Sequence, residues 1–261
     1  MMNSLWVAAT GMNAQDAKMQ SIANNLANVN TTAFKKDRVA FEDLMYSIQK
    51  APGTETGALN AHPTGIQIGN GVKVVGTEKV HTQGAIQTTN QELDIAIMGK
   101  GFFQVENADG ELLYTRNGQF RVNADGELVT TQGYPIVPNI ALPDNALSVS
   151  ISEEGIVSAM VPDQADPEDL GQLTLTNFAN PAGLMAKGGN MFSETAASGE
   201  ANELVAGTEG VGVLKQHALE ASNVEVVSEM VEMVNTQRGF EMASNLISKA
   251  DEMLQYAINR T

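Results

Sequence analysis

Apolar residues recur every seven positions along the last stretch of the chain, residues 222–256, which contains no proline. The line runs through Val226, Met233, Phe240, Ile247 and Leu254. Residues seven apart lie on one side of an α-helix, so this stretch is predicted to be one long helix. Ser222 and Asn223 are predicted to cap its start, because short polar side chains accept hydrogen bonds from the free N–H groups of a first turn.

Further apolar residues lie on one side of this line in the first half of the helix and on the other side in the second half. They are Val227, Met230, Val231 and Val234, and then Ala243, Leu246, Ala250, Met253 and Ala257. A single partner helix cannot follow such a change of face. We therefore expect one half to pack within its own subunit and the other on a neighbouring subunit. A buried helix of a single globular core is the alternative.

A second long helix is predicted for residues 3–28. Its seven-residue line is Leu5, Met12, Met19 and Leu26, with Ile22 among the residues that fill the positions between. Gln15 and Asp16 interrupt the line once, and such a polar break can fix the register of paired helices. Helical repeats at both ends of the chain predict that the two terminal helices pair with each other, most simply as a hairpin within one chain.

Short apolar runs separated by glycine predict β structure between the helices. The motif Asn107-Ala-Asp-Gly-Glu-Leu112 recurs as Asn123-Ala-Asp-Gly-Glu-Leu128. Asp-Gly between apolar runs is a strong hairpin pattern, and Asn117-Gly118 supplies another turn. Residues 102–131 are therefore expected to form a meander of short antiparallel strands.

These patterns together predict an α+β fold. Long N- and C-terminal helices, residues 1–34 and 222–261, form a helical, coiled-coil-like assembly domain. Residues 72–192 form a β-rich outer domain of short antiparallel strands. Residues 35–71 and 193–221 form an extended connecting region between the two.

Charge is distributed unevenly along the chain. The chain carries 15 basic and 31 acidic side chains, for a net charge of −16, of which residues 1–34 contribute zero and residues 222–261 contribute −3. The acidic excess therefore lies in the middle, which indicates a solvated middle and packed ends. Nucleic acid is not an expected partner, since binding it requires a basic surface.

The sequence shows no arrangement of residues typical of catalysis or of metal binding. It contains no cysteine, and its histidines, His62, His81 and His217, lack the spacing of metal ligands. Gly99-Lys-Gly101 does not complete a phosphate-binding loop and is predicted to be a turn between strands. We expect no enzyme, cofactor, metal or small-molecule substrate. The N-terminus also lacks the pattern of a cleaved signal peptide.

Several segments together resemble the bacterial flagellar rod and hook proteins. The N-terminal motif is Ala23-Asn-Asn-Leu-Ala-Asn-Val-Asn-Thr-Thr-Ala-Phe-Lys35, which includes Asn24, Asn25, Asn28, Asn30 and Phe34. The match continues in Gly101-Phe-Phe-Gln-Val105, Thr115-Arg-Asn-Gly-Gln-Phe120, Ser222-Asn-Val-Glu-Val-Val227 and Gln237-Arg238. Two positions depart from the family: Ala33 stands where glycine is usual, and Gly239 where alanine is usual. Alanine at position 33 is strained if that position has a positive φ.

The segment 51–65, rich in glycine and proline, is predicted to be extended and irregular. It resembles the extra stretch that separates the distal-rod members of this family from the hook members, where it is associated with a straight, rigid rod. The resemblance therefore favours a distal rod subunit. A hook or proximal rod subunit is the alternative within the family, and a secreted β-rich adhesin or an enzyme are alternatives outside it.

The resemblance implies a structural subunit that polymerises helically into a rigid hollow drive shaft, transmitting torque from motor to hook. It implies self-association, contacts with proximal rod and hook proteins, and contacts with the periplasmic and outer-membrane rings. It also implies type III export without a cleaved signal peptide, and a place in the basal-body rod within the periplasm. The residues expected to drive self-assembly are Leu5, Met12, Met19, Ile22, Leu26, Val227, Val231, Val234, Phe240, Leu246, Ile247, Met253 and Leu254.

Overall fold

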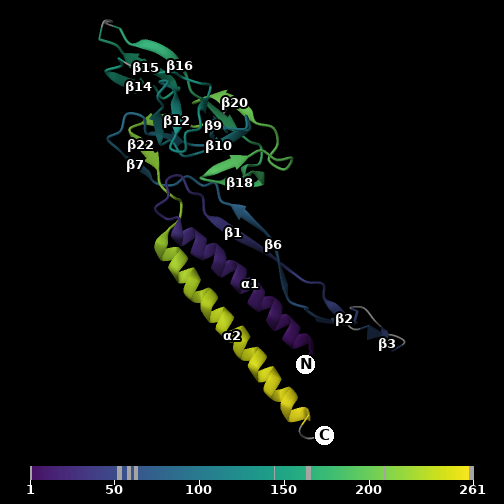
Figure 1. The fold of residues 1–261 in the computed structure, drawn as a ribbon. Coiled ribbons are helices and arrows are strands. Elements are labelled where there is room, and N and C mark those ends of the chain that lie inside the picture. Colours follow the sequence, from purple (N-terminus) through teal and green to yellow (C-terminus); the bar gives the residue numbers. More distant parts are fainter. Residues whose placement is uncertain are drawn as a thin grey trace. The chain divides into compact units, whose positions relative to one another are not determined.

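The computed structural model shows an α+β protein with a helix at each end and short antiparallel strands between (Figure 1). It describes residues 2–51, 55–57, 60–61, 64–143, 145–162, 166–208 and 210–258. The chain forms two compact units. Unit 1 comprises Met1–Ala27, Asp37–Glu78 and Glu225–Thr261, and unit 2 comprises Asn28–Lys36 and Lys79–Val224.

Both predicted helices are present in unit 1. Helix α1 spans Met2–Ala27 and helix α2 spans Val226–Ile258. The two pack side by side and run antiparallel (Figure 1), as the seven-residue repeats at both ends predicted. Among the described residues, neither helix combines the length and the apolar character that a membrane-spanning segment needs.

The predicted helix cap at Ser222 and Asn223 is wrong, because α2 begins only at Val226. The Ser222 hydroxyl instead accepts a hydrogen bond from the Val224 N–H at 3.2 Å. The Asn223 side chain instead accepts one from the Lys36 N–H at 2.8 Å. Both side chains therefore act within unit 2, before the helix starts.

Unit 1 also contains a ribbon of paired strands, and its strand β1 contacts α1, which lies between α2 and this ribbon (Figure 1). Strand β1 pairs with β6, β2 with β5 and β3 with β4. The bounds are β1 Asp37–Asp43, β2 Ser47–Lys50, β3 Glu55–Gly57, β4 Asn60–Ala61, β5 Ile66–Ile68 and β6 Val72–Lys79. Within the segment 51–65, residues 52–54, 58–59 and 62–63 lie outside the described residues.

Unit 2 contains the remaining strands, in antiparallel sheets of two to five strands. The largest has the order β13-β9-β10-β19-β18, and a three-stranded sheet has the order β14-β15-β16. The strands are β7 Ile86–Thr88, β8 Ile95–Met98, β9 Phe103–Glu106, β10 Leu112–Thr115, β11 Phe120–Val122, β12 Leu128–Thr130, β13 Ile136–Val137, β14 Ser148–Ile151, β15 Ile156–Met160, β16 Glu168–Gln172, β17 Thr174–Asn177, β18 Met185–Gly188, β19 Met191–Ser193, β20 Asn202–Val205, β21 Val213–Gln216 and β22 Ala218–Glu220, with a short 3₁₀ helix at Pro181–Gly183.

The two units group the residues differently from the three-part division expected from the sequence. Strand β6 lies in unit 1 rather than in the β-rich part, because it pairs with β1. The segment 193–221, expected to be a connection, instead supplies β20, β21 and β22, which pair with β17, β8 and β7. Strands this short were not evident in a glycine-rich segment.

The two Asp-Gly repeats form the predicted hairpins. Strand β9 pairs with β10 and β11 with β12, and Gly110 and Gly126 at the two turns have φ of 77° and 82°. The predicted continuous meander is wrong, however, because β10 pairs on its other side with β19 and not with β11. Gly118 lies in the link between β10 and β11, where a Cβ atom would approach the Ile95 carbonyl oxygen to 1.6 Å. Only a residue without a side chain therefore lets the backbone at position 118 approach the backbone at Ile95 so closely.

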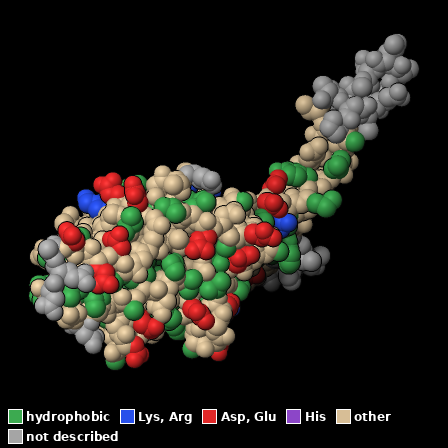
Figure 2. Space-filling model, turned by 90° about the horizontal axis from the view of Figure 1, so that it is seen from above, with side chains coloured by type: hydrophobic (Ala, Val, Ile, Leu, Met, Phe, Trp, Pro, Cys, Tyr) green, Lys and Arg blue, Asp and Glu red, His purple; other side chains and the backbone are tan. Residues whose placement is uncertain are grey.

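The main apolar core lies inside unit 2. Phe103 and Phe120 meet edge to face at its centre, with ring centroids 5.0 Å apart. A second, aromatic cluster contains Phe102, Tyr114, Phe178 and Phe192. Acidic side chains outnumber basic ones on the surface turned toward the viewer in Figure 2.

Candidate assembly interface

The contact between α1 and α2 is built mostly from small or polar side chains. On α2 the buried residues are Glu229, Thr236 and Ala250, and on α1 they are Ala8, Ala14, Ile22 and Asn25. An exposed ion pair, Lys18 to Glu232 at 2.7 Å, flanks this contact and contributes little, as surface pairs do. The large apolar side chains of the two helices, apart from Ile22, are half-buried or exposed wherever the structure describes them, so the helix pair leaves apolar surface uncovered.

The residues predicted to drive self-assembly fall into two groups. Ile22 is buried, and Leu5, Met12, Met19, Leu26 and Ile247 are half-buried. The exposed ones are Val227, Val231, Val234, Phe240, Leu246 and Met253. The side chain of Leu254 lies outside the described residues. Half of the predicted residues whose side chains the structure describes are thus exposed.

The expectation that α2 packs one half on its own subunit and the other on a neighbour is not what the structure shows. Large apolar side chains of both halves are exposed, Val231 at 57% and Leu246 at 64%, whereas Ala250 is buried. Of the seven-residue line, Val226, Met233 and Ile247 are half-buried and Phe240 is 37% exposed. We call the other exposed large apolar side chains of this helix the outer stripe of α2: Val227, Met230, Val231, Val234, Met242, Leu246, Met253 and Tyr256.

The strand ribbon of unit 1 exposes apolar side chains too, and the sequence pattern did not mark them. They are Phe41, Met45, Tyr46, Ile48, Ile66, Ile68, Val74 and Val75. Tyr46 is 51% exposed, and a hydrogen bond from its hydroxyl to Asp43 raises the pKa of that hydroxyl. Apolar residues alternate with other residues in the segment 66–75, and this alternation was the one pattern that could have indicated a strand ribbon with an apolar face.

The asparagine-rich motif joins α1 to the ribbon and forms a turn. Asn25 is buried, and its side chain makes hydrogen bonds to both the N–H and the carbonyl of Asp37, at 2.8 and 3.0 Å. It also donates to the Glu229 carboxylate of α2 at 3.3 Å, and Asn24 donates to the Asp37 carboxylate at 2.9 Å. Asn25 therefore links three elements of unit 1.

The remaining motif residues have different roles. Asn28 accepts hydrogen bonds from Thr31 in the turn after α1, and Asn30 is exposed. Phe34 is buried beneath the Lys79 ammonium group, 4.7 Å from the ring centroid. The last two, Gln237 and Arg238, are exposed on α2.

Ala33 has a φ of 58°, so position 33 does require the left-handed conformation that glycine adopts without strain. Its N–H donates to the Glu220 carbonyl at 2.7 Å, and its methyl group is buried. The conditional expectation of strain at this position is confirmed. The surrounding contacts hold the alanine in a conformation that costs about 1–2 kcal/mol for a residue with a Cβ atom.

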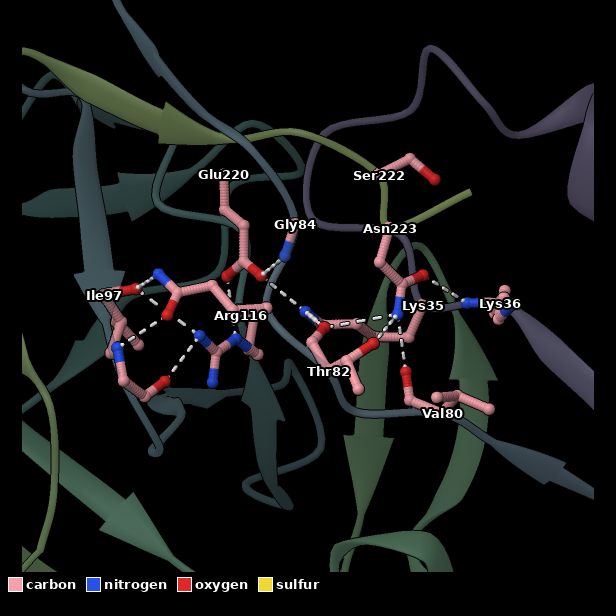
Figure 3. Close-up of polar contacts among 12 residues, drawn as sticks. Lys35, Lys36, Val80, Thr82, Gly84, Ile97, Arg116, Glu220, Ser222 and Asn223 are labelled. Carbon is pink, nitrogen blue, oxygen red and sulfur yellow. Dashed lines mark hydrogen bonds and ion pairs between the residues drawn. The ribbon is translucent and has the colours of Figure 1, made fainter. Parts of the chain in front are cut away.

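Unit 2 contains a buried charged triad that the sequence did not reveal (Figure 3). The Glu220 carboxylate accepts from the Lys35 ammonium at 2.5 Å and from the Arg116 guanidinium at 2.9 Å. Arg116 also donates to the carbonyls of Gly99 and Gly101, the predicted strand turn, at 2.9 and 3.0 Å. Burial lowers the pKa of Lys35, with Arg116 acting in the same sense, whereas Glu220 opposes the shift.

His81 lies beside the triad, against the aromatic cluster. Its ring meets Phe102 and Phe192 edge to face, at 5.5 and 5.4 Å between centroids. Burial, reinforced by the charges of Lys35 and Arg116, lowers the pKa of His81 to about 4. Within the described ranges, no group of three or more His, Asp or Glu side chains could hold a metal ion.

Comparison with known proteins identifies the class. Residues 5–35 match the family described as flagella basal body rod protein, and residues 96–159 match the D1 domain of the flagellar hook protein FlgE/F/G. Residues 215–260 match the C-terminal family of flagellar basal body rod FlgEFG proteins. The terminal helices and part of unit 2 are thus those of flagellar rod and hook proteins.

Relatives that match the chain over nearly its full length show which family within this class it belongs to. The chain is 46% identical to the flagellar basal-body rod protein FlgG of Buchnera aphidicola subsp. Acyrthosiphon pisum, over 98% of both chains. It is 46% identical to FlgG of Borreliella burgdorferi, over 99% of this chain and 98% of the relative, and 39% identical to FlgG of Bacillus subtilis, over 99% of both. The chain belongs to the FlgG family of flagellar basal-body rod proteins. It is a structural subunit of the distal rod and not an enzyme.

Proposed function

We propose that this subunit polymerises helically into the rigid, hollow drive shaft that transmits torque from motor to hook. The outer stripe of α2 is the observation that carries this proposal. Monomeric soluble proteins rarely expose contiguous apolar surface of such extent, and larger patches mark interaction sites. A stripe running along a 33-residue helix is suited to contact with further copies of the chain.

The apolar surfaces of unit 1 favour an open polymer over a closed pair. The stripe on α2 and the exposed side chains of the ribbon are different surfaces, so a contact between unlike surfaces of two copies can repeat indefinitely. Such head-to-tail contacts generate helical filaments when the rotation does not close a ring. Each contact is modest, and repetition along the polymer makes the whole stable.

The finer assignments belong to this proposal. The two helices act as a coiled-coil-like pair, residues 1–34 and 222–261 form the assembly domain, and the β-rich part faces outward. The predicted self-assembly residues that are buried or half-buried, such as Ile22 on α1 and Ile247 on α2, hold the pair together, and the exposed ones contact neighbours. The segment 51–65 contributes to rod rigidity.

We further propose the partners and the location that the family implies. The polymer joins proximal rod proteins at one end and hook proteins at the other, with periplasmic and outer-membrane rings around it. The subunit is exported by the flagellar type III apparatus without a cleaved signal peptide and assembles within the periplasm. The place in the basal body is supported by the names of the relatives, which are basal-body rod proteins.

Electron microscopy of the concentrated, purified full chain tests the central proposal. Tubes with a helical repeat are expected above a critical concentration, and dilution should dissolve them. A chain that stays monomeric at all concentrations, with and without seeds of preformed rod, would contradict polymerisation through its own surfaces.

A further inference from the structure

The chain crosses between unit 1 and unit 2 at four places, which we call passages. Residues of unit 2 next to three of these passages meet around the side chain of Asn223. The passages lie after Ala27, Lys36, Glu78 and Val224. Asn223 lies one residue before the last of them. Its side-chain oxygen accepts from the Lys36 N–H at 2.8 Å, at the second passage (Figure 3).

The other end of the same amide reaches the third passage. The Asn223 Nδ2 group donates to the Val80 carbonyl at 2.7 Å and lies within 3.2 and 3.0 Å of the Thr82 carbonyl and hydroxyl oxygens. One asparagine side chain therefore joins three chain segments, residues 33–36, 79–82 and 220–224. Asparagine is suited to this position because it offers an acceptor and two donors at once.

Backbone bonds and the buried triad bring the same three segments together. The Ala33 N–H donates to the Glu220 carbonyl at 2.7 Å, and the Val80 N–H donates to the Lys36 carbonyl at 2.9 Å. The Lys35 ammonium donates to the Thr82 carbonyl at 2.7 Å and to the Glu220 carboxylate. Because the Lys35 and Glu220 side chains are fully buried, separating them leaves unpaired charge in the interior.

We propose that Asn223 and the triad of Lys35, Arg116 and Glu220 form a clasp that fixes these three segments of unit 2 as one rigid cluster. Arg116 anchors the cluster to the body of unit 2 through the carbonyls of Gly99 and Gly101. Three of the sequence motifs shared with the flagellar rod and hook proteins, residues 23–35, 115–120 and 222–227, therefore meet at this clasp.

The clasp matters mechanically for the proposed drive shaft, and this part of the inference rests on the proposed function. Force that passes along the chain from unit 1 to unit 2 enters through the covalent passages. If the ends of the three passages moved independently, a load on one segment would open its local hydrogen bonds alone. A shared cluster distributes the load over three segments, and local opening then requires the breaking of a whole network.

Amide hydrogen exchange on the full-length monomer tests the clasp without requiring polymerisation. The variant Asn223→Ala removes the side-chain bridge, and Asn180→Ala is the matched control, since its amide bonds the Ala197 carbonyl at 3.0 Å elsewhere in unit 2. The N–H groups of Ala33 and Val80 are the informative ones, because they donate to the Glu220 and Lys36 carbonyls and not to Asn223, which bonds the Val80 carbonyl. We expect both to exchange about tenfold to a hundredfold faster in Asn223→Ala and to be unchanged in the control.

Two results would overturn the clasp. Acceleration of the Lys36 amide alone would show that the three segments are independent, and equal acceleration throughout β9 and β10 would show a general loss of stability. If Asn223→Ala does not fold, Asn223→Asp serves instead, because it keeps the acceptor for Lys36 and loses the donors to Val80 and Thr82. That variant is expected to accelerate exchange at Val80 more than at Lys36, and the reverse order would refute the assignment.

The mechanical role is tested on polymers. Tubes of Asn223→Ala are expected to form at the wild-type critical concentration and to bend more, with a persistence length at least twofold shorter by electron microscopy. Tubes as stiff as wild type would refute the load-sharing role and leave the proposed rod function intact. Failure of the wild-type chain to form tubes would refute the rod function, while the exchange result would still decide the clasp.

Discussion

The substitution Val231→Asp is expected to leave the chain folded and to stop its polymerisation. The substitution Leu246→Asp is expected to do the same. In the structure both side chains are more than half exposed, on opposite halves of α2. Exposed substitutions away from special features usually change the stability of a monomer by less than about 0.5 kcal/mol. This expectation replaces the sequence-based one, in which one of the two variants would have lost order within the subunit.

The effect on assembly follows from the exposed fractions, 57% for Val231 and 64% for Leu246. Full burial of such a side chain is worth about 1.5–3 kcal/mol, so burying the exposed part contributes about 1–2 kcal/mol per subunit. Burial of an unpaired carboxylate adds a cost of about 2 kcal/mol or more. A combined loss of about 3 kcal/mol corresponds to a critical concentration raised roughly a hundredfold.

The assay compares these variants with Ile22→Asp, which places the charge at a buried position of α1 instead, where Ile22 is 3% exposed. Amide exchange and circular dichroism report the order of the helices in the monomer, and sedimentation reports the critical concentration. We expect Ile22→Asp to lose helix protection in the monomer, whereas the two outer-stripe variants keep it.

Two outcomes would refute this reasoning. If Val231→Asp or Leu246→Asp loses helix protection as Ile22→Asp does, the outer stripe is part of the internal packing of the subunit. If both polymerise at the wild-type concentration, the stripe is not an assembly surface.

Three further predictions concern other parts of the chain. The pKa of His81 is about 4 in the folded chain and about 6.5 in the unfolded one, so as the pH falls the unfolded state takes up the proton before the folded state does. The contribution of His81 to the free energy of unfolding is therefore fully present above pH 6.5, and the free energy of unfolding should fall by roughly 2–3 kcal/mol as the pH is lowered to 4. Denaturant titrations at several pH values would show this, and His81→Phe, which has no titrating ring, should remove that part of the slope. Gly239→Ala should raise the melting temperature less than Gly11→Ala, because an added Cβ at Gly239 meets the Gln15 side chain at 3.3 Å and at Gly11 meets nothing, while each gains about 1 kcal/mol of helix propensity; equal gains would contradict it. Deletion of residues 51–65 should leave the melting transition of unit 2 unchanged and give bent tubes by electron microscopy; loss of that transition would make the segment part of the core.

The existence of both terminal helices could be predicted from the sequence, because a seven-residue apolar repeat is a local property of an α-helix. The predicted bounds of α1 agree within one residue, whereas α2 begins four residues later than predicted. The two Asp-Gly hairpins could be predicted for a similar reason, since a turn and its flanking residues lie within a few positions of each other. The resemblance in the motif at residues 23–35 also identified the family, which the relatives confirm.

The partners of each element could not be predicted, because they are distant in the sequence. Strand β10 pairs with β19 and not with the nearby β11, so a local turn at Asn117-Gly118 indicated a pairing that does not exist. Asn223 looked like a helix cap because capping requires only a short polar side chain before a helix, whereas its actual partners are more than a hundred residues away.

The sequence alone therefore determined which segments are helical, where the sharp turns lie and which family the chain resembles, since each depends on residues close together along the chain. Tertiary structure alone decided which face of α2 is covered and which is free, because a repeat shows that a face is apolar without showing its neighbour. It also decided that Lys35, Arg116 and Glu220 share one buried site, since charges so far apart in sequence are stable in the interior only when the fold brings them together.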